Sequence, residues 1–166
     1  MNQLIDLCLY FESLKTLEGV MIPALISAAI LQRQWQFTRR KPLVFTLLII
    51  TVAISAWLSR WGSGGLHVFT AGLVCWPLMV MRFPDDFPWE MAYPMAFLSV
   101  LIPDVYKAGT MAVWRDGWFF GIGGGGFHDG DFIAPALTLV AAFTIHLCQK
   151  RGMFAFGVDK RSAPAG

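Results

Sequence analysis

The sequence predicts an all-α, polytopic helical membrane protein with about five transmembrane helices. Hydrophobic residues make up 56% of the 166 residues and charged residues only 14%, against roughly 25% charged residues in an average soluble domain. Five apolar runs approach the length that crosses a bilayer. The charged residues gather between these runs, so there is too little polar surface to cover a soluble core. Lipid is therefore the expected solvent.

The apolar runs predict the transmembrane spans in chain order. The first is short for a hydrocarbon core of about 30 Å, which needs about 20 residues. Tilt, or extension into the N-terminal segment, would lengthen it. Pro23 lies inside this span, where neighbouring helices can satisfy the freed carbonyl group. Trp57 and Trp61 mark the far end of the second span, as interfacial aromatic residues do. The predicted spans are 17–31, 43–58, 66–81, 89–103 and 132–148.

These spans form one predicted transmembrane domain, residues 1–155, followed by a flexible tail, residues 156–166. The first 15 residues have helical spacing, and Glu12, Lys15 and Glu18 follow one side of that helix. We expect this charged stripe to face lipid headgroups; the alternative is burial against another helix. The three cysteines are far apart and fit apolar positions better than a disulfide framework or a zinc site.

The basic residues predict the orientation. With five spans, the first loop, the third loop and the C-terminal tail share one side of the membrane. That side holds nine of the thirteen Lys and Arg residues: Arg33, Arg39, Arg40, Lys41, Arg82, Lys150, Arg151, Lys160 and Arg161. The positive-inside rule then places the C-terminus in the cytoplasm and the N-terminus outside. We expect an integral protein of the bacterial inner membrane.

The segment from Asp104 to Pro135 is neither an apolar span nor a tail, and it faces outward in this topology. Its aromatic part, 112–120, predicts a short helix that lies on the outer leaflet or folds back between the spans. Gly121, Gly123 and Gly126 formally match G-x-G-x-x-G. No strand precedes them, so a dinucleotide site is excluded. A hinge is expected, and a ligand-cradling nest is the alternative.

His128, Asp129 and Asp131 form the candidate site. An imidazole and two carboxylates this close in sequence can bind a divalent metal or act as acid and base. Asp104 and His67 lie at the same predicted membrane face and could join them. The structural alternative is that Asp131 caps the last span and that both aspartates complement its helix dipole. Intramembrane aspartyl proteases are excluded, because their Gly-x-Gly-Asp motif would need glycine where His128 stands.

Three functions fit the sequence. The first is a non-enzymatic accessory or interaction subunit, because the polar cluster has a sufficient structural explanation. The second is a membrane-embedded enzyme with a His/Asp site, with or without metal, at the outer face. The third is a transporter or an oligomeric pore, although the spans offer few polar residues to line a path. The expected partners are the lipid bilayer and a membrane or periplasmic protein or further copies of the chain, without nucleic acid. The sequence identifies no cofactor.

Overall fold

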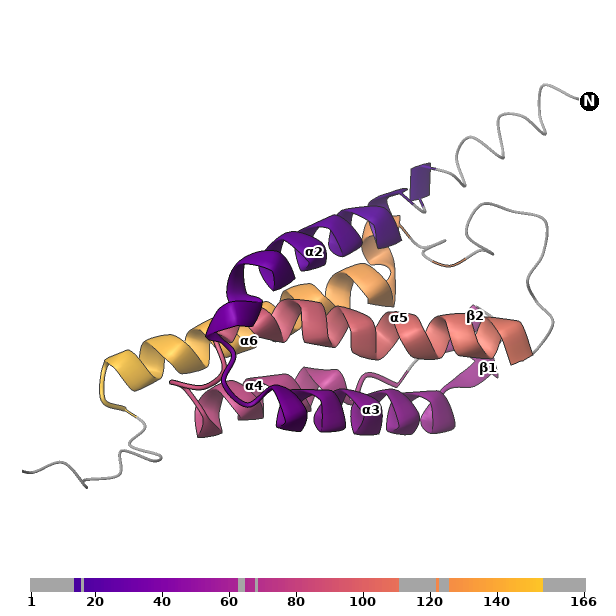
Figure 1. Ribbon diagram of the computed structural model, residues 1–166. Coiled ribbons are helices and arrows are strands. Elements are labelled where there is room, and N and C mark those ends of the chain that lie inside the picture. Colours follow the sequence, from indigo (N-terminus) through magenta and orange to yellow (C-terminus); the bar gives the residue numbers. More distant parts are fainter. Residues whose placement is uncertain are drawn as a thin grey trace, which may run out of the picture.

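The computed structural model describes residues 14–15, 17–62, 65–67, 69–110, 122 and 126–153. Almost all of them are helical, which confirms the predicted helical class (Figure 1). The predicted N-terminal helix before residue 14, the aromatic element 112–120 and the tail 156–166 lie outside the described residues. The elements are η1 (Leu17–Met21), α2 (Ile22–Gln34), η2 (Trp35–Phe37), α3 (Lys41–Leu58), β1 (Arg60–Gly62), β2 (Gly65–His67), α4 (Gly72–Arg82), η3 (Trp89–Met91), α5 (Ala92–Thr110), η5 (Gly126–His128) and α6 (Gly130–Lys150).

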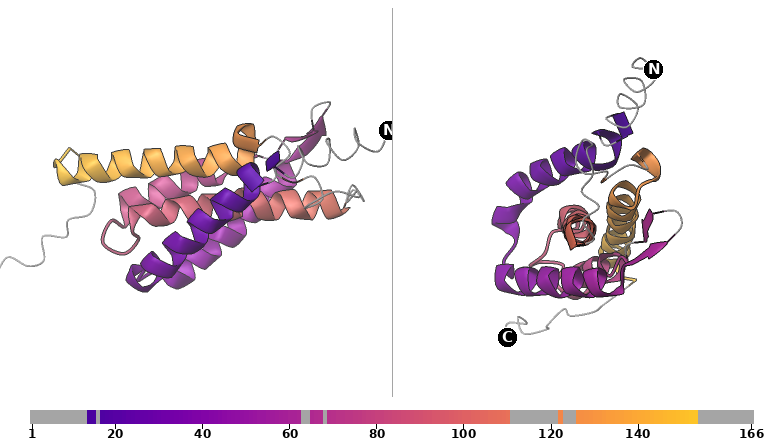
Figure 2. Two further views of the ribbon diagram at one scale, coloured as in Figure 1. Left: turned by 90° about the horizontal axis from the view of Figure 1, so that it is seen from above. Right: turned by 90° about the vertical axis from the view of Figure 1, so that its right-hand side faces the viewer.

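Helix α5 is the centre of the bundle. It packs against α2, α3, α4 and α6. Figure 2 (right) looks along α5, with α2, α3 and α6 around it. Every residue from Met91 to Phe97 is buried. The predicted fourth span therefore packs mainly against other parts of the protein.

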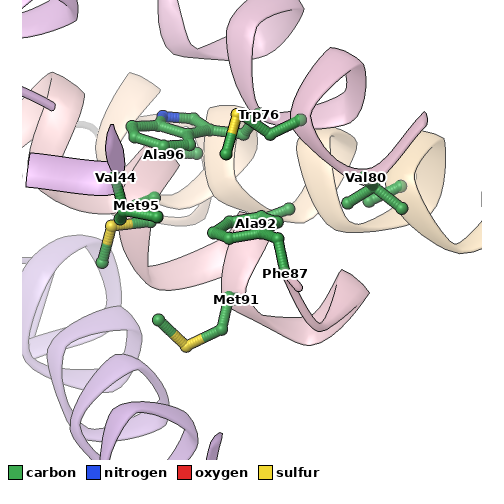
Figure 3. Packing of buried hydrophobic residues seen from close by; sticks show 10 residues of the cluster. Val44, Trp76, Val80, Phe87, Met91, Ala92, Met95 and Ala96 are labelled. Carbon is green, nitrogen blue, oxygen red and sulfur yellow. The ribbon is translucent and has the colours of Figure 1, made fainter. Parts of the chain in front are cut away.

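The main core joins α5 to its neighbours at the end of the bundle where α5 begins. Trp76 of α4 stacks on Phe87, with ring centroids 6.1 Å apart. Figure 3 shows both among the buried side chains Val44, Val80, Met91, Ala92, Met95 and Ala96. A second, smaller core lies nearer the other end of α5, where Val20 of η1, Phe97 and Ile122 pack together. One residue of the long loop is thus anchored between η1 and α5.

Ser99 links three helices by hydrogen bonds. Its hydroxyl donates to the carbonyl of Met95 (2.7 Å) and accepts from the indole N–H of Trp76 (3.1 Å). It also lies 3.0 Å from the Thr51 hydroxyl of α3. Gly72 of α4 packs against this group, because a Cβ there would lie 3.1 Å from the Ser99 Cβ. Small residues and interhelical hydrogen bonds of this kind hold helices together where the hydrophobic effect between them is weak.

Four of the predicted spans coincide with helices, and the third needs correction. Predicted span 66–81 begins in strand β2, and its helix, α4, begins only at Gly72. Strand β2 pairs antiparallel with β1, with Arg60 opposite His67. The glycine-rich RWGSGGLH sequence explains this difference, since it permits a tight reversal that an apolar count does not detect. Helix α4 has 11 residues, about 17 Å of helix, which is less than the hydrocarbon thickness.

Within the described residues, two helices are long and apolar enough to cross a membrane by themselves, α3 and α6. Both carry large exposed apolar side chains. Ile49 of α3 is 68% exposed and Val140 of α6 is 63% exposed.

The predicted first and third loops and the C-terminal end of α6 meet at one end of the bundle. Arg40 forms an ion pair with Asp86 (2.6 Å), and the backbone N–H of Arg39 donates to the Asp86 carbonyl (2.9 Å). Gln149, near the end of α6, donates to the carbonyl of Met81 (2.9 Å). We call this the basic end. The start of α6 and the end of α5 lie at the opposite, acidic end, together with the β1–β2 hairpin (Figures 1 and 2).

Candidate functional site

The cap of helix α6 is Asp129 rather than Asp131. Asp129 has extended backbone angles (φ −71°, ψ 148°), and its carboxylate accepts the backbone N–H of Asp131 at 3.1 Å. This is the usual geometry of an N-cap aspartate. The prediction that Asp131 caps this helix is therefore wrong. The helix begins one residue before Asp131, so the side chain of Asp131 points from within the first turn.

Asp131 is fully buried. Among the residues that the structure describes, neither of its carboxylate oxygens has a hydrogen-bond partner. Buried polar side chains almost always have a partner, and an isolated ionised carboxylate in an apolar surrounding is very costly. Helix capping consequently explains Asp129 but not Asp131. Asp131 is left as a buried ionisable group at the end of an apolar helix.

Asp104 belongs to the same cluster, from the last turns of α5. Asp104 and Asp129 are close enough to Asp131 to interact with it electrostatically. Asp104 is half-buried and lies one residue beyond predicted span 89–103. Burial, with a smaller contribution from the negative charge of Asp129, raises the pKa of Asp104 to about 6. Asp104 therefore keeps its proton to a higher pH than an exposed aspartate does.

Glu18 is a fourth carboxylate at the acidic end, and sequence reasoning missed it. Element η1 packs against η5 and the start of α6. A Cβ at Gly126 would lie 2.9 Å from a Glu18 carboxylate oxygen. Gly126 has φ +59°, which glycine adopts without strain. Glu18 was predicted to face lipid headgroups along the helix side that holds Lys15. No pattern in the sequence points from Glu18 to a glycine over one hundred residues away.

His128 does not join the buried carboxylates. His128 is exposed on η5. His67 ends strand β2 at the acidic end, and its side chain lies outside what the structure describes. Among the described residues, no group of three or more His, Cys, Asp or Glu side chains is arranged to hold a metal ion. The structure thus brings together Asp104, Asp129 and Asp131, three of the five predicted site residues.

The arrangement favours proton binding over substrate binding. Two carboxyl groups, on Asp104 and Asp131, lie in a poorly hydrated place, and like charges disfavour ionisation of both at once. The capping carboxylate of Asp129 is already engaged. Asp131 itself has no solvent-exposed surface.

The chain matches no protein-family model, and it has no match among curated proteins or among solved structures. Its fold and its acidic cluster therefore have to be interpreted from their own physical chemistry.

Proposed function

We propose that this chain is a small integral protein of the bacterial inner membrane whose five α-helices cross the bilayer. The apolar surfaces of α3 and α6 support the proposal, because only 17% and 28% of their apolar stretches are buried. A core helix of a soluble protein would be mostly covered. The hydrogen-bonded contact of α3, α4 and α5 at Ser99 is also typical of membrane bundles. The C-terminus is cytoplasmic in this proposal, because the basic end carries Arg39, Arg40 and Lys41.

Within that membrane, the chain acts as a non-enzymatic accessory or interaction subunit. The observation that carries this function is the position of an apolar cavity among the described residues. It has a volume of about 580 Å³ and lies between α2, α3 and α5, with Trp35, Val44 and Met95 in its apolar lining. It is at the opposite end of the bundle from Asp131. This cavity and the buried carboxyl groups are thus separate, whereas an enzyme needs a cavity and its ionisable groups together.

Site-specific photo-cross-linking in native membranes tests the accessory function. A photoreactive amino acid replaces Ile49 on α3 or Val140 on α6, both exposed. We expect a discrete protein adduct from at least one of these faces, formed with another membrane protein or with a second copy of the chain. The matched control is Val100, which is 2% exposed and should give no intermolecular adduct. Adducts with lipid alone at both exposed positions would contradict an interaction subunit.

A second function, a membrane-embedded enzyme, is favoured by the buried carboxyl group of Asp131, which has no hydrogen-bond partner within the described part of the chain. Ionisable residues inside membrane helices are often functional. Asp131→Asn removes the ionisable group and preserves the shape, and His128→Ala removes the nearby exposed imidazole. In an accessory subunit both variants should retain the cross-links and complement a deletion strain. Lost complementation by both variants, with insertion and cross-links intact, would favour the enzyme.

A further inference from the structure

The cavity at the basic end is a groove between two helices that diverge. α2 and α3 both pack on α5 but have little contact with each other, and Figure 2 (right) shows them leaving the turn at η2 in different directions. Leu31 and Trp35 line one wall, Val44 and Leu48 the other, and Met95 and Leu98 of α5 line the floor. The groove is open to its surroundings along one side. Its volume, about 580 Å³, is within the range of small-ligand sites.

The groove is continuous with the exposed apolar surface of α3. Phe45 lines it and is itself 53% exposed, and Ile49, one turn further along α3, is 68% exposed. In a protein that lies in a bilayer, this surface faces hydrocarbon. A ligand would therefore enter from the side, through the lipid, rather than from water.

The mouth of the groove is polar and basic. Lys41 lines it, and its ammonium group lies 5.5 Å from the centroid of the Trp35 ring. Gln32 and Gln36 lie on the other side and are exposed. The charge of Arg40, the residue before Lys41, is compensated by Asp86. One cation, Lys41, and two amide groups thus line an otherwise apolar groove.

We propose that this groove binds an anionic glycerophospholipid, with an acyl chain along α3 from Val44 to Leu48 and the phosphate at Lys41. Basic pockets between transmembrane helices at the cytoplasmic side bind anionic headgroups. An anionic phospholipid supplies both an acyl chain for the apolar lining and a negative charge for Lys41, whereas a water-soluble anion would leave the lining uncovered. The proposal rests on the proposed membrane location, so insertion is measured separately for every protein used.

Lipid photo-cross-linking locates the acyl chain. The purified full-length protein is reconstituted in phosphatidylcholine nanodiscs that contain a small fraction of phosphatidylglycerol with a photoreactive group in mid-chain. We expect adducts on the peptides that carry Leu48 and Leu98, above those on the exposed α6 face around Leu137. Equal labelling of both faces would overturn the proposal. Cross-links between two copies through Leu48, with no lipid adduct there, would assign the groove to a protein interface instead.

Two variants with matched controls test the two parts of the site by native mass spectrometry of retained lipid. Lys41→Gln should reduce retention of phosphatidylglycerol about fivefold, the effect of one Lys at a lipid surface. Arg82→Gln removes an exposed charge at the same end but outside the groove and should change little. Leu48→Trp fills the groove and should abolish retention, whereas Leu137→Trp on α6 should not. An unchanged Lys41→Gln protein, or full retention by Leu48→Trp, would overturn the site.

A measurement of membrane insertion distinguishes a failure of the lipid site from a failure of the membrane proposal. If the variants resist carbonate extraction as the unmodified chain does and phosphatidylglycerol is retained no better than phosphatidylcholine, the lipid site is wrong and the membrane location stands. If the unmodified chain is itself extracted, both are wrong. Should Leu48→Trp not fold, the adduct map of the unmodified protein still decides the question.

Discussion

At the scale of single residues, Ser99 has more interhelical partners than any other hydroxyl that the structure describes. We expect Ser99→Ala to lower the free energy of unfolding by about 1–2 kcal/mol, because the buried indole N–H of Trp76 and the hydroxyl of Thr51 lose their shared partner. Unfolding by a denaturing detergent measures the effect. Thr144→Val is the control, since Thr144 is exposed and bonds only within α6. Equal losses in the two variants would refute the role of Ser99.

Asp104 gives the protein a pH-dependent stability. Its raised pKa, about 6, means that the folded protein binds this proton more tightly than the unfolded chain, whose aspartates titrate near pH 4. The contribution of Asp104 is therefore most favourable below pH 4 and is lost as the pH rises to about 6. Asp104→Asn should abolish this loss. We therefore expect the free energy of unfolding of the variant, minus that of the unmodified protein, to be about 2 kcal/mol larger at pH 8 than at pH 4.

Unfolding curves at the two pH values measure this difference for Asp104→Asn. Asp85→Asn serves as the control, because Asp85 is exposed at the basic end, and it should show no comparable pH-dependent gain. A constant difference between Asp104→Asn and the unmodified protein across this pH range would show that the Asp104 carboxyl group is not desolvated by the fold.

The sequence could nominate the aspartates near the start of α6 but could not assign their roles. Asp129 and Asp131 both precede an apolar run, and either can cap a helix that begins at the next residue. The cap is decided by the position of the first helical residue, and helix boundaries shift by one or two residues at little energetic cost. Asp131 lies close enough to Asp104 to interact with it electrostatically, and Asp104 belongs to α5, which is distant in sequence. No local pattern encodes that packing.

At the scale of elements, the approach of α4 to α5 depends on Gly72. A Cβ at this position would lie 3.1 Å from both the Ser99 Cβ and the Trp76 Nε1. Neither neighbour can move easily, because both residues are fully buried. We expect Gly72→Ala to destabilise the protein by about 1–3 kcal/mol through overpacking. Thermal unfolding in detergent measures the loss.

Gly130, in the first turn of α6, is the matched control for Gly72. Nothing lies within 4 Å of a Cβ there, and alanine restricts the unfolded chain more than glycine does. Gly130→Ala should therefore be neutral or stabilise by up to about 1 kcal/mol. A Gly72→Ala protein as stable as the Gly130→Ala protein would show that α4 and α5 have room to separate.

At the scale of elements, long apolar runs predicted the positions of α3 and α6 well. Helix α3 begins two residues before predicted span 43–58 and ends with it. Helix α6 extends two residues beyond predicted span 132–148 at each end. The prediction was wrong at Leu66 and His67, where hydrophobicity is equally compatible with a strand. It also could not show that α5 is enclosed by protein. A composition that suits lipid suits a buried helix equally.

At the scale of the whole molecule, charge and hydrogen bonding define two ends. At the basic end, main-chain and side-chain contacts join the loop around Arg39 to Asp86 and the C-terminal end of α6 to the end of α4. The acidic end holds Glu18, Asp104 and Asp131. The basic residues alone predict that these loops share one side of the membrane. The contacts between the loops place them together independently of that rule.

The number of membrane crossings can be decided at Asp85. If all five helices cross, Asp85, between α4 and α5, lies on the cytoplasmic side with Arg39, and His128 lies outside. If only α3 and α6 cross, Asp85 lies on the same side as His128. All three positions are exposed, so single cysteines there, in a chain without Cys8, Cys75 and Cys148, should react with an impermeant maleimide. We expect external labelling at His128 alone, because the ion pair of Arg40 with Asp86 would otherwise have to cross the bilayer. External labelling of Asp85→Cys together with His128→Cys would reduce the crossings to two.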